Sequence, residues 1–290
     1  MGSREFAGCH PAVIVTFYIF VVWIAVTANR PEFVLAALLT SFIYAAYLGG
    51  IKTIKSNLIF FVIILVVMAV INTLFTHNGE TVLFYINGNR ITAEAFWYGV
   101  VAACMLSTVI FWFSSFNILM TSEKIVYLFG RIAPVLGLTL SMIFRYIPLL
   151  KERYSEIVTG QKCMGRNTKR PRQVMKQVSI LIAWSLESSI ETADSMEARG
   201  YGLHGRTSFH MFKMRASDVI TLIVILILGG LSVWAGITDL SDMYYYPAID
   251  YVPMDGITTL LLIAYLVLML MPLAIDVKGD IRWKQSDLMA

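Results

Sequence analysis

The sequence has few cysteines and few charged residues. Its three cysteines, Cys9, Cys104 and Cys163, lie far apart in a chain of 290 residues, which excludes a disulfide framework and the short spacings of a zinc site. Charged residues make up 14% of the chain and hydrophobic residues 58%, a balance that excludes an ordinary soluble domain. The composition therefore indicates a multi-pass membrane protein.

Motifs of common catalytic chemistry are also missing. The sequence has no Gly-x-x-x-x-Gly-Lys-Ser/Thr loop to hold nucleotide phosphates, no nucleophile elbow and no His-Glu pair of the zinc-protease type. We therefore expect no catalytic residue, no metal site and no cofactor in this chain. Any use of ATP would require a separate ATPase.

Six apolar runs are long enough to cross about 30 Å of hydrocarbon. They are Pro11 to Ala28, Glu32 to Leu48, Leu58 to Thr76, Ala93 to Phe116, Val219 to Ile237 and Ile257 to Ile275. The first run also resembles a signal peptide, because its end, Val26-Thr27-Ala28, offers small residues for cleavage. The connection to the second run is only about three residues, which favours a retained helix in a hairpin.

A seventh apolar run, Pro134 to Leu150, is shorter and follows an amphipathic stretch that begins at Thr121. It either crosses the membrane or lies at the interface. Arg145 lies inside this run, where an arginine is either functional or extends its charge toward the interface; the sequence leaves both open. Pro148 is expected to break the run and to turn the chain into the next helix.

Basic residues predict the orientation, because Lys and Arg concentrate in cytoplasmic loops. If the seventh run lies at the interface and both termini are cytoplasmic, the charge of every loop agrees with this rule. The predicted cytoplasmic stretches are Lys52 to Lys55, Lys124 to Arg131, Lys151 to Arg215 and the tail with Lys278, Arg282 and Lys284. The loop Asp239 to Gly256 has four aspartates and no basic residue, and is predicted to be external.

The long stretch from Lys151 to Arg215 holds 12 of the 23 basic residues and six acidic ones. Its densest part, Lys162 to Lys176, suits either anionic lipid headgroups or a protein partner, and the sequence favours neither. Nucleic acid is not an expected ligand, because no nucleic-acid-binding module accompanies the charge.

Two helices are predicted within this stretch, from Pro148 to about Met164 and from Gln173 to Arg199. Gly165 and Gly200 follow them, and glycine just past a helix end adopts the left-handed conformation at little cost. The second helix, about 27 residues long, would span about 40 Å at 1.5 Å per residue.

Three acidic residues of the second helix, Glu187, Glu191 and Asp194, share one face. Another face carries an apolar stripe: Val174, Val178, Leu181 and Trp184. A solvated face is the first interpretation of the acidic residues. The alternative is a magnesium site of a prenyl-diphosphate enzyme, although the clustered Asn/Asp repeats of that chemistry are missing.

Polar residues at the end of the third run are better explained by structure than by ligand binding. Asn72 is interpreted as a helix-packing residue and His77-Asn78-Gly79 as a turn.

Short motifs spread over nearly the whole chain carry a family resemblance. They are His10-Pro11, Asn72-Thr73-Leu74-Phe75, His77-Asn78-Gly79-Glu80-Thr81, Thr121-Ser122-Glu123-Lys124, Arg145-Tyr146-Ile147-Pro148 and, as the most specific, Glu197-Ala198-Arg199-Gly200. With these motifs the chain resembles the transmembrane (T) component of energy-coupling factor transporters, the bacterial vitamin and metal importers.

The resemblance implies two cytoplasmic coupling helices, each ending in an Ala-Arg-Gly motif whose arginine enters a groove on one of two ATPase subunits. The second motif, Ala198-Arg199-Gly200, is intact, with Glu197 before it. The first is altered to Cys163-Met164-Gly165, and Arg166 lies about 200 degrees around a helix from Met164. Contact at the first groove is therefore expected to be weaker or more apolar.

An arginine at a helix end also has a purely structural interpretation. Its planar fork of donors suits paired carboxylate or carbonyl contacts with a partner, but it also complements the helix dipole. Arg199 is accordingly expected to bind an ATPase subunit, with simple capping of its helix as the alternative.

The predicted fold is an all-α multi-pass membrane protein with about six transmembrane helices and long cytoplasmic coupling helices. Its predicted parts are residues 1–120 with four spans, residues 121–216 with the interfacial and coupling helices, and residues 217–290 with the last spans and a cytoplasmic tail. The predicted function is a coupling subunit of the bacterial cell membrane that transmits ATPase motion to a separate substrate-binding membrane (S) subunit.

Other functions and the cargo stay open. A self-sufficient secondary transporter is the first alternative, and the prenyl-diphosphate enzyme is the second. The sequence does not identify the vitamin or metal, nor whether the chain serves one substrate-binding subunit or several.

Overall fold

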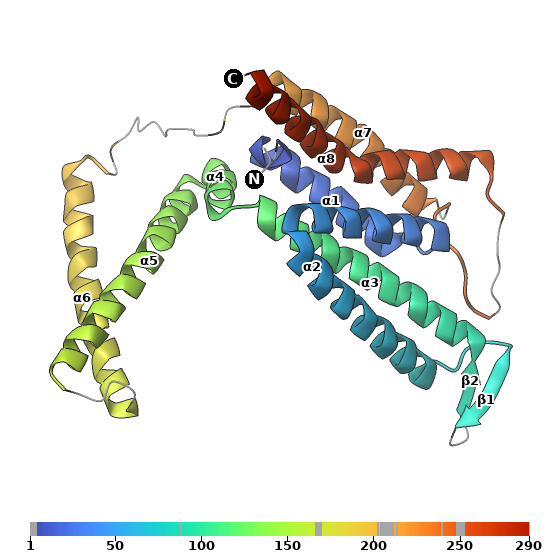
Figure 1. The fold of residues 1–290 in the computed structure, drawn as a ribbon, viewed down its shortest axis with the longest axis horizontal. Helices are drawn as coiled ribbons and strands as arrows, with labels where there is room; N and C mark the ends of the chain where they lie inside the picture. Colours follow the sequence, from blue (N-terminus) through green and yellow to red (C-terminus); the bar gives the residue numbers. More distant parts are fainter. Residues whose placement is uncertain are drawn as a thin grey trace. The chain divides into compact units, whose positions relative to one another are not determined.

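The computed structural model describes residues 5–86, 89–165, 170–201, 203, 212, 214–238, 240–247 and 253–289. Within them the regular structure is helical apart from one β-hairpin (Figure 1). The elements are η1 Phe6–Gly8, α1 Pro11–Thr27, α2 Pro31–Phe75, β1 Val82–Ile86, β2 Asn89–Thr92, α3 Ala93–Leu119, α4 Ser122–Ile132, α5 Pro134–Cys163, α6 Pro171–Ala198, α7 Ala216–Ile237 and α8 Gly256–Met289. The predicted all-α multi-pass fold is confirmed.

The chain divides into two compact units. The span unit comprises Met1–Thr121 and Lys213–Ala290, and the α4–α6 unit comprises Ser122–Phe212. Among the described residues, the five helices that are long and apolar enough to cross a membrane all lie in the span unit, whereas α5 and α6, which are as long but less apolar, belong to the other unit.

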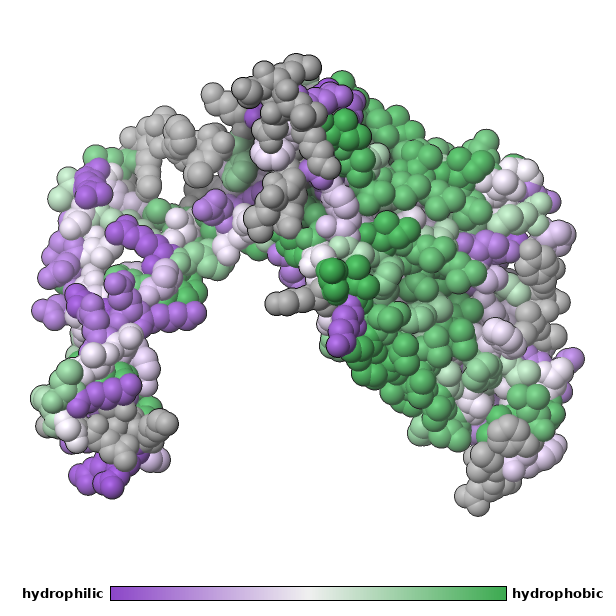
Figure 2. Space-filling view, in the orientation of Figure 1, coloured by the Kyte–Doolittle hydropathy of each residue, from purple (hydrophilic) through white to green (hydrophobic). Residues whose placement is uncertain are grey.

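Five helices are long and apolar enough to cross a membrane. They are Pro31–Ile51, Thr53–Phe75, Ala93–Leu119, Ala216–Ile237 and Gly256–Trp283. The remaining predicted span, the first apolar run, corresponds to α1, which is apolar but only 17 residues long. Hydrophobic residues cover the face of the span unit seen in Figure 2, as expected for helices in contact with lipid. Helix α5, which contains the seventh run, does not meet the criteria for a span.

A kink at Gly50 takes the place of the predicted loop from Lys52 to Lys55. The residues after the kink are helical, and Gly50 has a φ of 69°, inside the left-handed region. Because glycine adopts that conformation at little cost, one residue redirects the chain without a loop. The prediction of a loop at Lys52 to Lys55 is therefore wrong, since these residues lie in the first turn of the next span.

Aromatic residues form much of the core where α1, α2 and α3 meet. Phe17, Tyr18, Tyr44 and Trp112 are almost fully buried, and the ring centroids of Phe17 and Tyr18 lie 5.6 and 5.9 Å from that of Trp112. The Tyr18 hydroxyl lies 2.8 Å from Oγ of Ser115 in α3. The tyrosine hydroxyl is thus paired within the core, as burial of a polar group requires.

Helices α2 and α3 approach closely through a small residue and a polar one. A Cβ at Gly99 would lie 3.0 Å from Cα of Ala69, so a side chain here would push the two helix backbones apart. Asn72 Nδ2 donates a hydrogen bond of 2.6 Å to the carbonyl oxygen of Ala95. The helix-packing interpretation of Asn72 agrees with this contact.

A carboxylate is buried where α8 meets α2 and η1. Asp276 is fully buried and accepts hydrogen bonds from the backbone N–H of Phe6, at 2.8 Å, and from the Tyr44 hydroxyl, at 3.1 Å. One turn later, Asp280 accepts a hydrogen bond from Tyr47. These bonds offset part of the cost of burying a carboxylate and fasten α8 to α2.

The β-hairpin before α3 was not predicted. Strands β1 and β2 pair antiparallel, and the carboxylate of Glu94 at the start of α3 accepts hydrogen bonds from the backbone and hydroxyl of Thr81, at 3.0 and 2.6 Å. His77 Nδ1 lies 3.1 Å from the carbonyl oxygen of Arg90. His77 thus ties the connecting segment to β2, consistent with its interpretation as part of a turn.

Pro148 does not break the helix as predicted. Helix α5 runs from Pro134 to Cys163 with Pro148 inside it, so a first coupling helix that starts at Pro148 is wrong. An internal proline removes one backbone hydrogen bond. The hydroxyls of Tyr146 and Tyr154, on either side of Pro148, both donate to side chains of α6. This packing holds both halves of α5 in one helix.

Candidate functional site on the α5–α6 pair

Helices α5 and α6 pack against each other in antiparallel order. The Tyr146 hydroxyl donates to Oγ of Ser188 at 3.0 Å, and the Tyr154 hydroxyl, further along α5, donates to Oε1 of Gln177, nearer the start of α6. The end of α6 therefore lies beside the first half of α5, and the end of α5 lies beside the start of α6.

A buried amide pair joins the end of α5 to α6. Gln177 is fully buried and Gln161 nearly so, and Nε2 of Gln177 donates to Oε1 of Gln161 at 2.9 Å. Together with the Tyr154 hydroxyl, this contact satisfies polar groups that would otherwise be buried without partners. The sequence interpretation missed this network; its only signal was the spacing of Tyr154 and Gln161, seven residues apart on one helix face.

Helix α6 ends in a complete Schellman motif. Arg199 is the C-cap residue, and Gly200 has a φ of 81°. The backbone N–H of Gly200 donates to the backbone carbonyl oxygen of Glu197 at 2.9 Å. The N–H of Tyr201 donates to the carbonyl oxygen of Met196 at 3.0 Å. Both bonds satisfy carbonyls at the helix end, so glycine fixes where Arg199 lies relative to the helix.

Helix α5 also ends at a left-handed glycine. Met164 is the C-cap residue, Gly165 has a φ of 72°, and its N–H donates to the carbonyl oxygen of Lys162 at 2.9 Å. The Met164 side chain is 63% exposed. Arg166, which follows this end in the sequence, lies outside the described residues.

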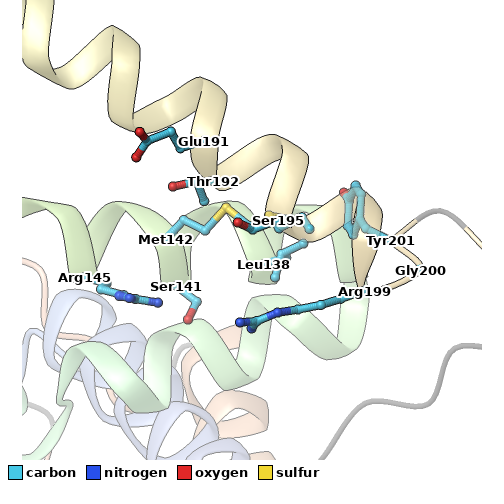
Figure 3. A pocket seen from close by; sticks show the side chains of 11 residues that line it. Leu138, Ser141, Met142, Arg145, Glu191, Thr192, Ser195, Arg199, Gly200 and Tyr201 are labelled. Atoms are coloured by element: carbon cyan, nitrogen blue, oxygen red, sulfur yellow. The ribbon is translucent and has the colours of Figure 1, made fainter.

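A cleft of about 600 Å³ lies between the first half of α5 and the end of α6. Arg145 and Arg199 both line it, and in Figure 3 their guanidinium groups point toward each other with Ser141 between them. The full lining is Leu138, Ser141, Met142, Arg145, Glu191, Thr192, Ser195, Met196, Arg199, Gly200 and Tyr201. The cleft therefore offers two cations beside hydroxyl groups.

A second, more apolar cleft of about 460 Å³ adjoins the first. Met142, Thr192 and Met196 line both clefts. Ile143, Ile147 and Leu150 contribute to the second cleft alone. This side of the helix pair is suited to an apolar side chain of a partner.

The predicted site residues fall into two groups. Arg145, Arg199 and Gly200 meet at the 600 Å³ cleft. Cys163, Met164 and Gly165 lie at the end of α5, while Ala198 and Glu197 are exposed on the last turn of α6 and Pro148 is exposed on α5. Sequence spacing gave no signal that Arg145 and Arg199 share a cleft, because the crossing of the two helices brings them together.

The three acidic residues of α6, Glu187, Glu191 and Asp194, are exposed. Among the residues that the structure describes, no group of three His, Cys, Asp or Glu side chains is placed to hold a metal ion. The exposure of these acidic side chains agrees with a solvated face.

Comparison with known proteins gives the family. Residues 7–211 match the family model CbiQ, described as cobalt transport protein. A protein from Listeria innocua named energy-coupling factor transporter transmembrane protein EcfT is 29% identical over 217 residues, 67% of this chain and 81% of its own length. A protein of the same name from Bacillus selenitireducens is 27% identical over 233 residues, 72% of this chain and 84% of its own length. Another, from Streptococcus thermophilus, is 34% identical over 101 residues, 32% of this chain and 38% of its own length.

The family match covers more than half of the chain and includes both glycine-closed helix ends. The apolar spans agree with a membrane-embedded protein. The chain belongs to the CbiQ family, among the transmembrane components of energy-coupling factor transporters.

Proposed function

We propose that this chain transmits the motion of two partner ATPases to a separate substrate-binding membrane subunit during vitamin or metal uptake. The observation that carries the proposal is the pair of long helices, α5 and α6, each closed by a left-handed glycine, with Arg199 projecting at one end. In this proposal the α4–α6 unit is cytoplasmic and both helices are coupling helices.

The dimensions of the two helices support a mechanical role. They contain 30 and 28 residues, which at 1.5 Å per residue makes each about 40 to 45 Å long. The buried pair Gln161 and Gln177 and the contact of Tyr146 with Ser188 hold them at two separated points. A push on either end would therefore move the pair as one body.

An exposed apolar stripe on α6 supports a membrane partner. Val178, Ile182, Leu186 and Ile190 recur every four residues and are 41, 55, 63 and 64% exposed. That spacing places them along one side of the helix, and a contiguous exposed apolar face is typical of a binding surface. We propose that this stripe contacts the substrate-binding membrane subunit.

The start of α6 is suited to a lipid surface. Arg170, Arg172 and Lys176 are exposed there, and clustered basic residues attract anionic headgroups. Their position supports the proposal that this end lies near the cytoplasmic leaflet.

The test of the coupling role is the substitution Arg199→Glu. Reversing this charge should abolish copurification of the chain with the two ATPases, since a carboxylate would repel the acidic or carbonyl groups that an arginine contacts. The amount of chain inserted in the membrane should not change. Wild-type assembly and ATP-dependent uptake by the variant would remove Arg199 from this role.

One observation favours the alternative of a secondary transporter. Ionisable residues buried among membrane helices often serve ion pathways, and Asp276 is such a residue, which the sequence interpretation had not counted within a span. Vesicles containing the purified chain alone, under a proton or sodium gradient, distinguish the two functions. Uptake without ATPases that Asp276→Asn abolishes would favour the secondary transporter.

A further inference from the structure

We propose that Arg145 and Arg199 together form one receptor for a single carboxylate side chain of a partner ATPase subunit. The inference rests on the proposed coupling function and adds Arg145, a residue of the other helix, to the contact. The receptor would then consist of α5 and α6 jointly, rather than of the end of α6 alone.

The first argument is that neither arginine is hydrogen-bonded or ion-paired through its side chain within the described residues. Their side chains are exposed, and neither guanidinium has a hydrogen bond or an ion pair within the described part of the chain. Both line the same cleft and point toward each other (Figure 3). Two like charges that face each other repel, and an anion placed between them would relieve that repulsion.

The second argument is the set of donors around the cleft. Each guanidinium presents a planar fork of N–H donors that matches the two oxygens of a carboxylate. The hydroxyls of Ser141 and Ser195 also line the cleft, and neither has a hydrogen-bond partner among the described residues. A carboxylate between the arginines would therefore find donors on both helices.

The third argument is charge. Glu191 lines the cleft with the two arginines, so the charged lining sums to one positive charge, which complements a single carboxylate. The last turns of α6 also carry Glu187, Asp194 and Glu197, all exposed. An extended anionic membrane surface would face all of these carboxylates, whereas a partner's side chain brings a single negative charge, so they disfavour a phospholipid headgroup more than one carboxylate.

The adjoining apolar cleft adds a place for the residues beside that carboxylate. Its lining of Met142, Ile143, Ile147 and Met196 is continuous with the arginine cleft. On the ATPase surface, an acidic residue followed by an apolar one would fill both clefts. Because the contact touches α5 and α6, ATPase binding would hold the crossing of the two helices.

The experiment compares three charge reversals in the full chain, each variant purified alone, placed in lipid nanodiscs and then titrated with the separately purified ATPase pair. Arg199→Glu and Arg145→Glu should each weaken ATPase binding at least tenfold. The matched control is Lys151→Glu, which reverses an exposed charge on α5 outside the cleft lining, and should change binding less than twofold. Equal yield of monodisperse chain in all three excludes misfolding as the cause.

The outcomes separate the inference from the proposed function. If Arg199→Glu weakens binding while Arg145→Glu behaves like Lys151→Glu, the shared receptor is wrong and the coupling function stands. If Arg199→Glu has no effect, the proposed function fails as well. The ATPase carboxylate can also be tested by replacing an acidic residue of the ATPase with lysine. If such a change restores the binding of Arg145→Glu, it should also restore the binding of Arg199→Glu, because one carboxylate contacts both positions.

A lipid ligand gives a different pattern. The same measurements are repeated in nanodiscs of phosphatidylcholine alone and of phosphatidylcholine with phosphatidylglycerol. A defect of Arg145→Glu that occurs only with phosphatidylglycerol would assign Arg145 to a lipid headgroup and overturn the carboxylate receptor. The proposal expects the same defect in both lipids.

Discussion

The ends of α5 and α6 share a left-handed glycine and differ in the side chain before it. Gly165 and Gly200 have φ values of 72° and 81°, and each donates its N–H to the carbonyl three residues earlier. The residue before the glycine is Met164 in one helix and Arg199 in the other. The two helices therefore stop at the same position relative to the glycine, and the residue before that glycine is charged in only one of them.

This difference separates two roles within the motif. Glycine sets where the helix ends and how the chain leaves it, and the preceding residue sets what a partner meets there. Met164 is 63% exposed, so the end of α5 presents a flexible apolar side chain. We infer that the end of α6 supplies the charged contact and that the end of α5 supplies an apolar one.

Making the two ends alike should have the largest effect. Arg199→Met copies the end of α5 onto α6 and removes the charge without adding an opposite one. ATPase binding should fall about thirtyfold or more, since the loss of a charged hydrogen-bonding partner typically costs about 2 to 5 kcal/mol. Binding isotherms with the purified ATPase pair measure the change.

A matched variant at the other end completes this test. Met164→Ala truncates the side chain at the end of α5 and should weaken binding much less than Arg199→Met. Equal losses at both ends would contradict the division into one charged and one apolar contact.

The comparison also shows what could be predicted from the sequence. The ends of α5 and α6 were predicted to within about a residue, because a glycine after a long helical pattern is a local signal. The spans were predicted from apolar runs, which are also local signals. Each of these features depends on residues next to one another in the chain.

Features that depend on packing were missed or wrong. Pro148 was expected to end a helix, but contacts of Tyr146 and Tyr154 with α6 keep α5 continuous. The positive φ of Gly50, which removes the predicted loop, and the β-hairpin were not recognised. The meeting of Arg145 with Arg199 depends on how two helices cross, and no local pattern contains that information.

Removing the glycines should have an intermediate effect. An L-residue in the left-handed conformation costs about 1 to 2 kcal/mol, so Gly165→Ala and Gly200→Ala should both loosen their helix ends. A Cβ at Gly200 would also lie 3.0 Å from Cδ1 of Leu203, whereas Gly165 has open space. Gly200→Ala should therefore weaken ATPase binding more, by a few fold, and speed amide hydrogen exchange at Tyr201.

Gly160→Ala is the control for these substitutions. Gly160 lies inside α5, and a Cβ there would meet no atom within 4 Å. Alanine in a helix interior is more favourable than glycine by about 0.5 to 1 kcal/mol, so this change should stabilise the pair slightly. Faster exchange in Gly160→Ala as well would show that added methyl groups, and not the left-handed backbone, cause the effect.

The smallest effect is expected from Met164→Arg, which gives the end of α5 the residue found at the end of α6. The side chain at this position is exposed and follows a helix end that the backbone already fixes, so the folded structure should not change. An arginine at a helix carboxyl end also complements the dipole, worth about 0.3 to 1 kcal/mol. ATPase binding should stay the same or tighten by up to a few fold, as measured by the same isotherms. A loss of assembly would show that Met164 is not the position that corresponds to Arg199, and that the two ends were aligned in the wrong register.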